Sequence, residues 1–376
     1  MSPSPAINYP RLHLEGTPYE IGLAHGTQLS AQIHSQIQIY SEMFQETSKL
    51  SWPEVRGVAQ NFGVILSLRL PDIYSEMRGI AKGAGIDILD IIALNARSEI
   101  ALGLYSDASD GCTSLGWKLS SGSGPSGEDD EVILAQNWDW TPRVQQNLAV
   151  LSISSPGKPK IYMVTEAGVV GKIGFNSSSI GVCLNAIRAH PMDVTNVPIH
   201  VALRICLEST SSLEAIGKIT ELGGVASAQH ILIADPSGPS SLELSPLGDI
   251  VIQPHNPAIK GFIAHTNHFV QNRFVQPKPW LPDSPVRLER VNELALDLVN
   301  TSSAITNDLL RARIFSDTSH PPGSICRSED MSKPETTRSS TLFCIIMRLS
   351  LNAEPWAEIV WGKPSSEGTA EVWRMP

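Results

Sequence analysis

The chain changes character at Cys112. Before this residue, from Pro18 to about residue 104, apolar residues recur at helical spacing in runs that stop at Pro or Gly. After it, short β-type runs alternate with turns, and helical stretches are inserted between them. A chain that groups its strands together, with helices before and between them, is expected to form an α+β layered fold.

The expected elements follow from hydrophobic period and turn residues. Thr17 is the expected N-cap of the first helix, with Pro18 in its first turn. The segment 120–131 contains only Ser, Gly, Pro, Glu and Asp and is expected to be a solvated hairpin loop. We expect helices over 19–48, about 52–70, 72–84, 87–104, 198–222, 285–300 and 303–316, and strands over 113–119, 132–138, 147–154, 160–166, 169–175, 179–185, 228–235, 240–245, 249–253, 261–265, 340–349, 356–361 and 370–375.

The pentapeptide Asp-Gly-Cys-Thr-Ser at residues 110–114 can be interpreted as a peptide bond built to be cut. Cleavage between Gly111 and Cys112 would give Cys112 both a thiol and a free α-amino group. An α-amino group titrates near pH ~8 and can take the proton of the adjacent thiol, so the pair is a complete nucleophile and base. Taken alone, the pentapeptide also fits a buried thiol in a glycine-containing turn.

Charge and apolar runs exclude several classes of partner. The net charge is −10 and there is no Lys/Arg-rich run, which disfavours nucleic acid and anionic membrane surfaces. The apolar runs are far shorter than the roughly 20 residues that span a bilayer, and the first residues carry no secretory signal pattern. Five Cys without regular spacing indicate a reducing compartment. We therefore expect a soluble intracellular protein.

Three further clusters could supply partners for Cys112. Asp139 ends an apolar strand between two Trp, where a carboxylate needs a partner, although it could equally begin a turn. Asn267 also follows a strand and could donate its amide to an oxyanion. Arg327 is either a surface cation or the fixed partner of a buried carboxylate such as Asp139. His265 and His268 flank Asn267, but no further ligands occur at a recognisable spacing, so no metal site is expected.

These motifs carry a family resemblance. DGCTS, QNWDW, HTNH and SICR occur in the order seen in the fungal acyl-coenzyme A:isopenicillin N acyltransferase family, which belongs to the Cys-type N-terminal nucleophile hydrolases. Segments starting at Gly16, Arg78, Leu94, Thr165, Gly171 and Ala202 are similar as well. The resemblance spans roughly residues 12 to 361.

The resemblance implies a four-layer αββα sandwich of the N-terminal nucleophile hydrolase type. The chain would be made as a precursor that cuts its own Gly111–Cys112 bond. Residues 1–111 would become a helical leader, or small subunit, and residues 112–376 the catalytic large subunit. The two fragments would stay together as a heterodimer that forms one integrated domain.

The resemblance also implies a role for each site residue. Cys112 would be the nucleophile, with its freed α-amino group as base, and Asn267 would form the oxyanion hole. Asp139 and Arg327 would be the polar pair that orders the site. The expected reaction moves an acyl group from acyl-CoA, a co-substrate, to an amine related to 6-aminopenicillanic acid or isopenicillin N, or to another secondary-metabolite amine. No cofactor or metal is implied.

The sequence departs from the family pattern in two places. The loop 120–131 is longer, and the chain ends in Arg-Met-Pro rather than in a peroxisomal tripeptide, so a cytoplasmic location is expected. Two alternatives stay open: an amidohydrolase of small N-acyl amides or peptides on the same fold, and a non-catalytic binding protein that kept the fold. The remaining thiols, Cys183, Cys206 and Cys344, are expected in the core, and Cys326 near the site.

Overall fold

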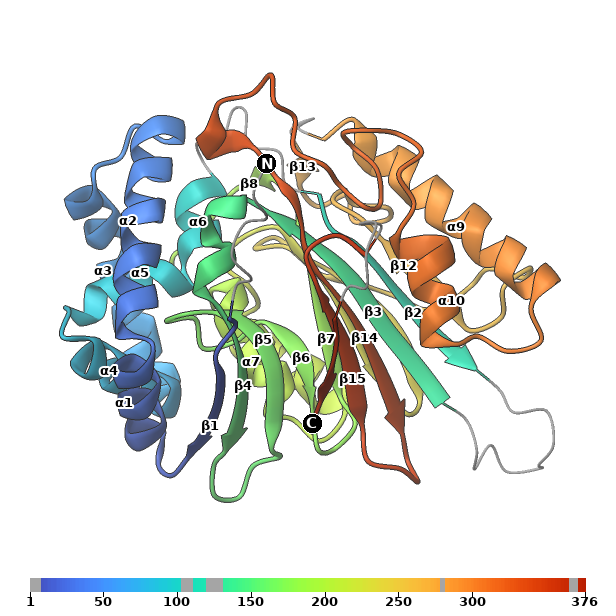
Figure 1. The fold of residues 1–376 in the computed structure, drawn as a ribbon. Coiled ribbons are helices and arrows are strands. Elements are labelled where there is room, and N and C mark those ends of the chain that lie inside the picture. Colours follow the sequence, from blue (N-terminus) through green and yellow to red (C-terminus); the bar gives the residue numbers. More distant parts are fainter. Residues whose placement is uncertain (1–7, 103–110, 120–130, 278–280, 365–370) are drawn as a thin grey trace.

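The computed structural model describes residues 8–102, 111–119, 131–277, 281–364 and 371–376. Apart from Glu131, the loop expected at 120–131 lies outside them. Two β-sheets stack face to face in the described part, and helices cover the outer face of each (Figure 1). The α+β fold class and the four-layer αββα sandwich expected above are confirmed.

The two large sheets are mostly antiparallel. The larger has the order β1-β4-β5-β6-β7-β9-β10-β11: Arg11–Glu15, Leu148–Ser154, Ile161–Glu166, Ile173–Asn176, Gly181–Ala186, Gln229–Asp235, Gly238–Leu244 and Ile250–Ile252. The smaller has the order β12-β2-β3-β14-β15-β16: Phe262–His265, Thr113–Leu119, Glu131–Trp140, Ser340–Ser350, Trp356–Trp361 and Val372–Met375. Strands β8 (Ala189–His190) and β13 (Gln276–Pro277) pair with each other as a short antiparallel ribbon.

The helices form two groups that bury different apolar clusters. One large core joins the first group to the eight-stranded sheet and the inter-sheet space, and a second core lies between the six-stranded sheet and the other group. The first group is α1 (Pro18–Gln28), α2 (Ser30–Thr47), α3 (Trp52–Arg69), α4 (Pro71–Ala84), α5 (Ile88–Asn95), α6 (Arg97–Leu102), α7 (Ile199–Leu207) and α8 (Ser212–Glu221); the second is α9 (Asp283–Thr301), α10 (Asn307–Leu310) and a π-helical turn at Arg311–Phe315.

Most predicted elements are present, but three helices are broken, the helix expected over 303–316 is shortened to α10 and the π-helical turn, and strands β1, β8 and β13 were not expected. The helices expected over 19–48, 87–104 and 198–222 are each divided in two, at Leu29, at Ala96 and at residues 208–211. Strand β1 was not expected; its alternating exposure, with Leu12 and Leu14 buried, is the period-two signal of an edge strand. Thr17 caps α1 as expected, with its side chain accepting from the Glu20 N–H.

Helices α1 and α4 pack through glycine. A Cβ at Gly22 or Gly26 would overlap the backbone of α4, and one at Gly79 or Gly83 would overlap the backbone of α1. Small residues at this spacing allow two helix backbones to approach closely, so these glycines serve packing. Gly85 ends α4 in the left-handed conformation, with φ 71°.

The residues before Cys112 are built into the same fold as those after it. Strand β1 extends the eight-stranded sheet by pairing in parallel with β4. Glu76 on α4 forms a buried bidentate ion pair with Arg204 on α7, at 2.9 and 2.6 Å.

In the described part of the chain, no helix is long and apolar enough to cross a membrane. All five Cys are buried there, and none forms a disulfide.

His25, a buried residue on α1, makes the stability of the folded chain sensitive to pH. Its Nε2 accepts the Gly168 N–H at 3.0 Å, and burial lowers its pKa from 6.5 to about 4. The unfolded chain therefore takes up a proton at His25 below pH 6.5 that the folded chain refuses until about pH 4, so stability falls as pH decreases through this window. Lowering the pH from 7.5 to 5 should remove about 1–2 kcal/mol through this residue. Thermal unfolding of His25→Gln, whose amide can still accept, should show a shallower pH dependence; an unchanged slope would contradict the assignment.

Candidate active site

Four strand ends meet at one edge of the six-stranded sheet. Strand β12 pairs with β2 (His265 opposite Ser114), β2 with β3 (Thr113 opposite Asn137), and β3 with β14 (Asp139 opposite Thr341). Because these neighbours are antiparallel, the ends of β12 and β3 lie beside the starts of β2 and β14. Residues far apart in the sequence are thereby brought to the residue that precedes β2, which is Cys112.

Cys112 lies in the interior beside Asp139. Only 1% of its surface is exposed, and its Sγ donates to the backbone oxygen of Asp139 at 3.8 Å. Its own carbonyl oxygen accepts from Arg287 Nη1 at 2.7 Å. Continuing the β2–β3 register by one residue places Cys112 opposite Trp138, and both belong to the apolar cluster between the sheets. The nucleophile expected from the sequence is thus held by its backbone and faces the inter-sheet core.

Arg287 is a site residue that the sequence analysis missed. From α9 it donates to the Cys112 carbonyl, to Thr113 Oγ1 at 3.1 Å, to Asn267 Oδ1 at 2.9 Å and, through Nε, to Asp283 at 2.8 Å. Burial and the nearby Arg327 lower its pKa, against the opposing effect of the carboxylates. A guanidinium stays charged and binds in a fixed planar geometry, so Arg287 ties the backbone of the nucleophile to the amide of Asn267.

Arg327 lies between two carboxylates. Its Nε is 3.5 Å from Asp139 Oδ2, the pair expected from the sequence, and its Nη2 makes a closer ion pair with Asp283, which was not expected. Thr341 fixes the arrangement, since its hydroxyl donates to Asp139 Oδ1 at 2.7 Å and accepts from the Arg327 N–H at 2.9 Å. Burial raises the pKa of Asp283, but Arg287 and Arg327 outweigh it and hold that pKa below its usual value.

Gly111 rests directly on the Arg327 guanidinium. A Cβ at Gly111 would overlap Nε, Nη2 and Cζ of Arg327. Since the Arg327 side chain is only 4% exposed and its guanidinium is paired with two carboxylates, it has little freedom to move aside. The bond between Gly111 and Cys112 therefore lies between two arginines, one against its glycine and one on the carbonyl of its cysteine.

Asn267 is oriented by both ends of its amide. Its Oδ1 accepts from Arg287 and its Nδ2 donates to the Ala186 oxygen at 3.0 Å. One Nδ2 hydrogen makes no hydrogen bond to the described residues and is available as a donor. The neighbouring His residues bind protein groups: His265 bonds Glu243 at 2.9 Å and His268 bonds the Ser284 hydroxyl at 2.7 Å. Among the described residues, no cluster of three or more metal-ligating side chains is found.

A buried charged cluster lies on the inter-sheet side of Cys112. Lys172, which precedes β6, donates to Glu166 Oε2, and its Nζ lies 3.8 Å from the centre of the Trp138 ring. Glu166 also accepts from Arg97 at 2.6 Å, and two neutral donors complete its shell: Gln36 at 2.6 Å and Tyr40 at 2.5 Å. Burial lowers the pKa of Lys172 to about 8, while Glu166 and Cys112 act in the opposite direction. Neither charge was expected at the site from the sequence.

Removing the charge of Glu166 should destabilise the fold strongly. Burial raises the pKa of Glu166, but Arg97 and Lys172 outweigh it and keep the carboxyl ionised. Glu166→Gln would leave two buried cations without their shared carboxylate, a loss of about 3–5 kcal/mol. Urea unfolding should show this loss, whereas Glu221→Gln, which changes an exposed carboxylate on α8, should change stability little. Equal stabilities of the two variants would contradict the ionic description of the cluster.

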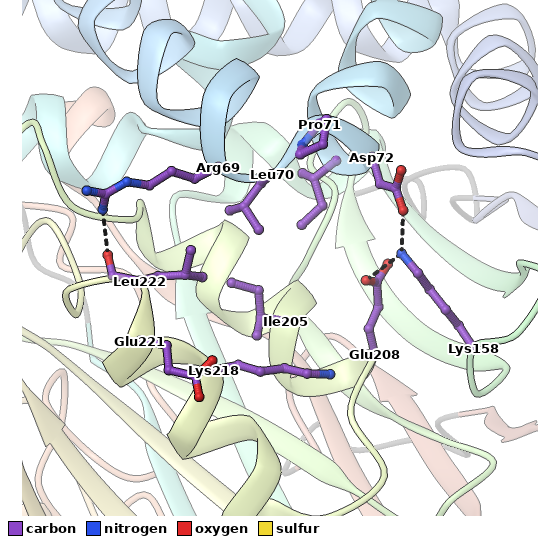
Figure 2. Close-up of a pocket in the computed structure, with 11 residues that line it drawn as sticks. Arg69, Leu70, Pro71, Asp72, Lys158, Ile205, Glu208, Lys218, Glu221 and Leu222 are labelled. Atoms are coloured by element: carbon purple, nitrogen blue, oxygen red, sulfur yellow. Dashed lines mark hydrogen bonds and ion pairs between the residues drawn. The ribbon is translucent and has the colours of Figure 1, made fainter.

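Two cavities differ in their relation to this site. One of about 310 Å³ is lined by Arg327 and Asp283, together with His320 and Lys333, and so opens onto the site. A larger one of about 550 Å³ lies between the α3–α4 junction and helices α7 and α8, and none of the site residues described above lines it (Figure 2). There Lys158 bridges Asp72 and Glu208, and Arg69 donates to the Leu222 oxygen. Of these two cavities, the smaller is therefore the one that adjoins the site, through Arg327 and Asp283.

Comparison with known proteins gives three findings. The family described as acyl-coenzyme A:6-aminopenicillanic acid acyl-transferase matches residues 126–365, a range that contains Asp139, Asn267 and Arg327. The acyl-coenzyme A:6-aminopenicillanic-acid-acyltransferase 40 kDa form of Emericella nidulans is 35% identical over 334 residues, which are 88% of this chain and 87% of that protein. The structure of penicillin V acylase from Agrobacterium tumefaciens aligns with a TM-score of 0.41 and 12% identity, over 70% of this chain and 86% of that one.

Proposed function

The chain belongs to the acyl-coenzyme A:6-aminopenicillanic acid acyl-transferase family and is an enzyme, and on that premise we propose that it matures by cutting its own Gly111–Cys112 bond. Cys112 then carries acyl groups from acyl-CoA to an amine. The observation that carries the proposal is the placement of this one bond, with Arg327 against Gly111 and Arg287 on the Cys112 carbonyl. A buried thiol in an ordinary turn requires neither of these arginine contacts.

Self-cleavage begins with an N→S acyl shift. The Cys112 sulfur attacks the Gly111 carbonyl carbon, the C–N bond breaks, and the nitrogen leaves as the α-amine after taking up a proton. The product is a thioester between Gly111 and the Cys112 sulfur. Water hydrolyses that thioester, which gives Gly111 a carboxylate and returns the thiol to Cys112. Asn267, through its second Nδ2 hydrogen, is the proposed donor to the oxyanion of each tetrahedral intermediate.

The mature site uses the same sulfur. The freed α-amine takes the Cys112 proton, the sulfur attacks the thioester carbon of an acyl-CoA, and CoA leaves as its thiol with that proton. An amine then attacks the acyl-enzyme, gives up a proton and leaves as the amide, while the Cys112 thiol is restored. Asp139 and Arg327 act as the polar pair that orders the new N-terminus.

The two fragments are proposed to stay together after the cut. Residues before Gly111 supply an edge strand of the larger sheet and the buried partners of residues after it. The contacts across the cut include Glu76 with Arg204 and Arg97 with Glu166, both buried ion pairs. Separating the fragments would expose the apolar core and these charges together, so the leader remains the outer helical layer of the enzyme.

Gly111→Ala should slow maturation. The added methyl overlaps the Arg327 guanidinium, so Gly111 must shift from its place, and regaining the reactive geometry against this overpacking costs about 1–3 kcal/mol in the transition state, or about 5- to 150-fold in rate. Full-length chain should therefore persist after synthesis, as followed by mass spectrometry over time. Gly217→Ala on α8, where a Cβ would meet open space, is the matched control and should mature normally. A Gly111→Ala chain cut as fast as wild type would contradict the proposed fit.

Incubation with an acyl-CoA and candidate amines tests the transferase reaction. With a medium-chain acyl-CoA and 6-aminopenicillanic acid, the acceptor named for the relative, the proposal predicts an amide and free CoA in equal amounts. Free acid in place of amide, with every amine tried, would favour the amidohydrolase on the same fold. Because both reactions pass through the same acyl-enzyme, mass spectrometry of Cys112 should detect that intermediate in either case.

A further inference from the structure

The uncut chain lacks the base that the mature site uses. Before cleavage the Cys112 nitrogen is part of the Gly111 amide and cannot accept the thiol proton. The sulfur must nevertheless become a nucleophile inside an apolar cluster, where burial disfavours a thiolate. Self-cleavage therefore needs another source of favourable electrostatics at Cys112.

Lys172 is positioned to supply this favourable electrostatic interaction at Cys112. Its Nζ lies over the Trp138 ring, and Trp138 is the cross-strand neighbour of Cys112 in the continued β2–β3 register. Side chains directly opposite on antiparallel strands lie about 5 Å apart, so the ammonium and the sulfur share one small region between the sheets. Lys172 is fully buried, which makes its field less screened than that of a surface lysine.

The other ionisable groups around Lys172 come from four elements. Glu166 on β5 binds its ammonium directly, and Arg97 on α6 and Tyr40 on α2 bind the same carboxylate. His200 on α7 completes the group; burial, Arg97 and Lys172 lower its pKa well below its usual value, so it stays neutral. Lys172 is thus held in place by a carboxylate, and its charge also acts on Cys112.

We infer that Lys172 is a positioning residue for maturation, whose positive charge favours ionisation of the Cys112 thiol before the chain is cut. The inference rests on the proposed self-cleavage. Before the cut, the lysine ammonium stabilises the negative charge on the sulfur. After the cut, the freed α-amine accepts the thiol proton. Attraction between the two groups is reciprocal: Cys112 raises the pKa of Lys172, and the lysine charge favours the thiolate to the same extent.

The test compares maturation of wild type, Lys172→Met and Lys172→Arg across pH 6 to 9. Fresh chains from cell-free synthesis are followed by intact mass as they are cut. An opposite charge within about 4–6 Å shifts an ionisation by about one to three pH units, so the Met variant should mature about 10- to 1,000-fold more slowly at neutral pH. The Arg variant keeps the charge and should restore most of the rate. Because the pKa of Lys172 is about 8, its charge is lost above that pH, and the wild-type and Met profiles should converge.

A second measurement, which needs no Lys172 variant, covers the case in which Lys172→Met does not fold. The ultraviolet absorbance of the Cys112 thiolate in the uncut fraction, followed against pH with Cys112→Ala as the blank, should have a midpoint below about 8.5, the value of a free cysteine. A midpoint at or above that value overturns the inference, as does a Met variant with the wild-type profile, or an Arg variant no faster than the Met variant. A wild-type chain that is never cut overturns the proposed function itself and the inference with it.

Discussion

Cys112→Ala should remain a single 376-residue chain that transfers no acyl group. The variant lacks the sulfur that, in the proposed mechanism, attacks the Gly111 carbonyl during maturation and the acyl-CoA carbonyl during turnover. The loss should therefore be complete in both assays. Intact mass and CoA release measure the two, and thermal unfolding shows that the uncut chain is folded.

Cys206→Ala is the matched control for this variant. Cys206 is also a buried thiol, on α7, and burial raises its pKa to about 12, which makes it unreactive. This control should be cut and should turn over like wild type. Cleavage of Cys112→Ala between residues 111 and 112 would show that the nucleophile is another residue.

Asn267→Ala should lower the rate of acyl-enzyme formation by about 100- to 1,000-fold, the usual effect of losing one oxyanion donor. The amide is held by Arg287 and by the Ala186 oxygen, so its remaining N–H points in a fixed direction before the reaction begins. The loss should appear in kcat rather than in KM, because the oxyanion exists only along the reaction path. Because Asn267 is also the proposed donor in self-cleavage, pre-steady-state release of CoA is measured per cut chain, with the cut fraction taken from intact mass.

Asn292→Ala supplies the control for the amide. Asn292 lies half-buried on α9, where its Nδ2 donates to the Leu288 oxygen within the same helix. Its removal should leave kcat unchanged. If Asn267→Ala turned over at the wild-type rate with an unchanged fold, the oxyanion donor would have to be a different group.

The separate parts of the site could be predicted because each is marked by a local pattern. Asp139 and Asn267 each follow an apolar run, where a polar side chain is placed at a strand end. That they meet at Cys112 was implied by the family resemblance, since strand order is a property of the whole sheet and no local pattern contains it. The closer partner of Arg327, Asp283, was missed for the same reason.

The charges inside the core could not be recognised from composition. Glu166 and Lys172 are six residues apart and would pass for surface residues, yet both are fully buried because each neutralises the other. Arg287 did carry a signal. It lies on the face of α9 that buries Ser284, Val291 and Ala295. A cation at the helical spacing of the buried residues indicates a buried partner.

The breaks at Leu29 and Ala96 had no marker in the chain, whereas the break at residues 208–211 contains Ser211, whose side chain accepts from the Glu214 N–H and caps α8. Neither Leu29 nor Ala96 is a residue type that usually ends helices, and each joins two separate helices of the structure. Tertiary packing overrides local propensity at such points. Strand β1 was missed because a five-residue edge strand gains its stability from pairing with β4, far away in the sequence.

The most direct test of the account is the intact mass of the purified wild-type protein. Cleavage at one bond predicts two masses, those of residues 1–111 and 112–376, which co-elute as one species under native conditions and separate when denatured. The second fragment should begin with Cys112 in N-terminal sequencing. A single full-length mass that persists after long incubation would contradict self-cleavage, and with it the assignment of Cys112 as an N-terminal nucleophile.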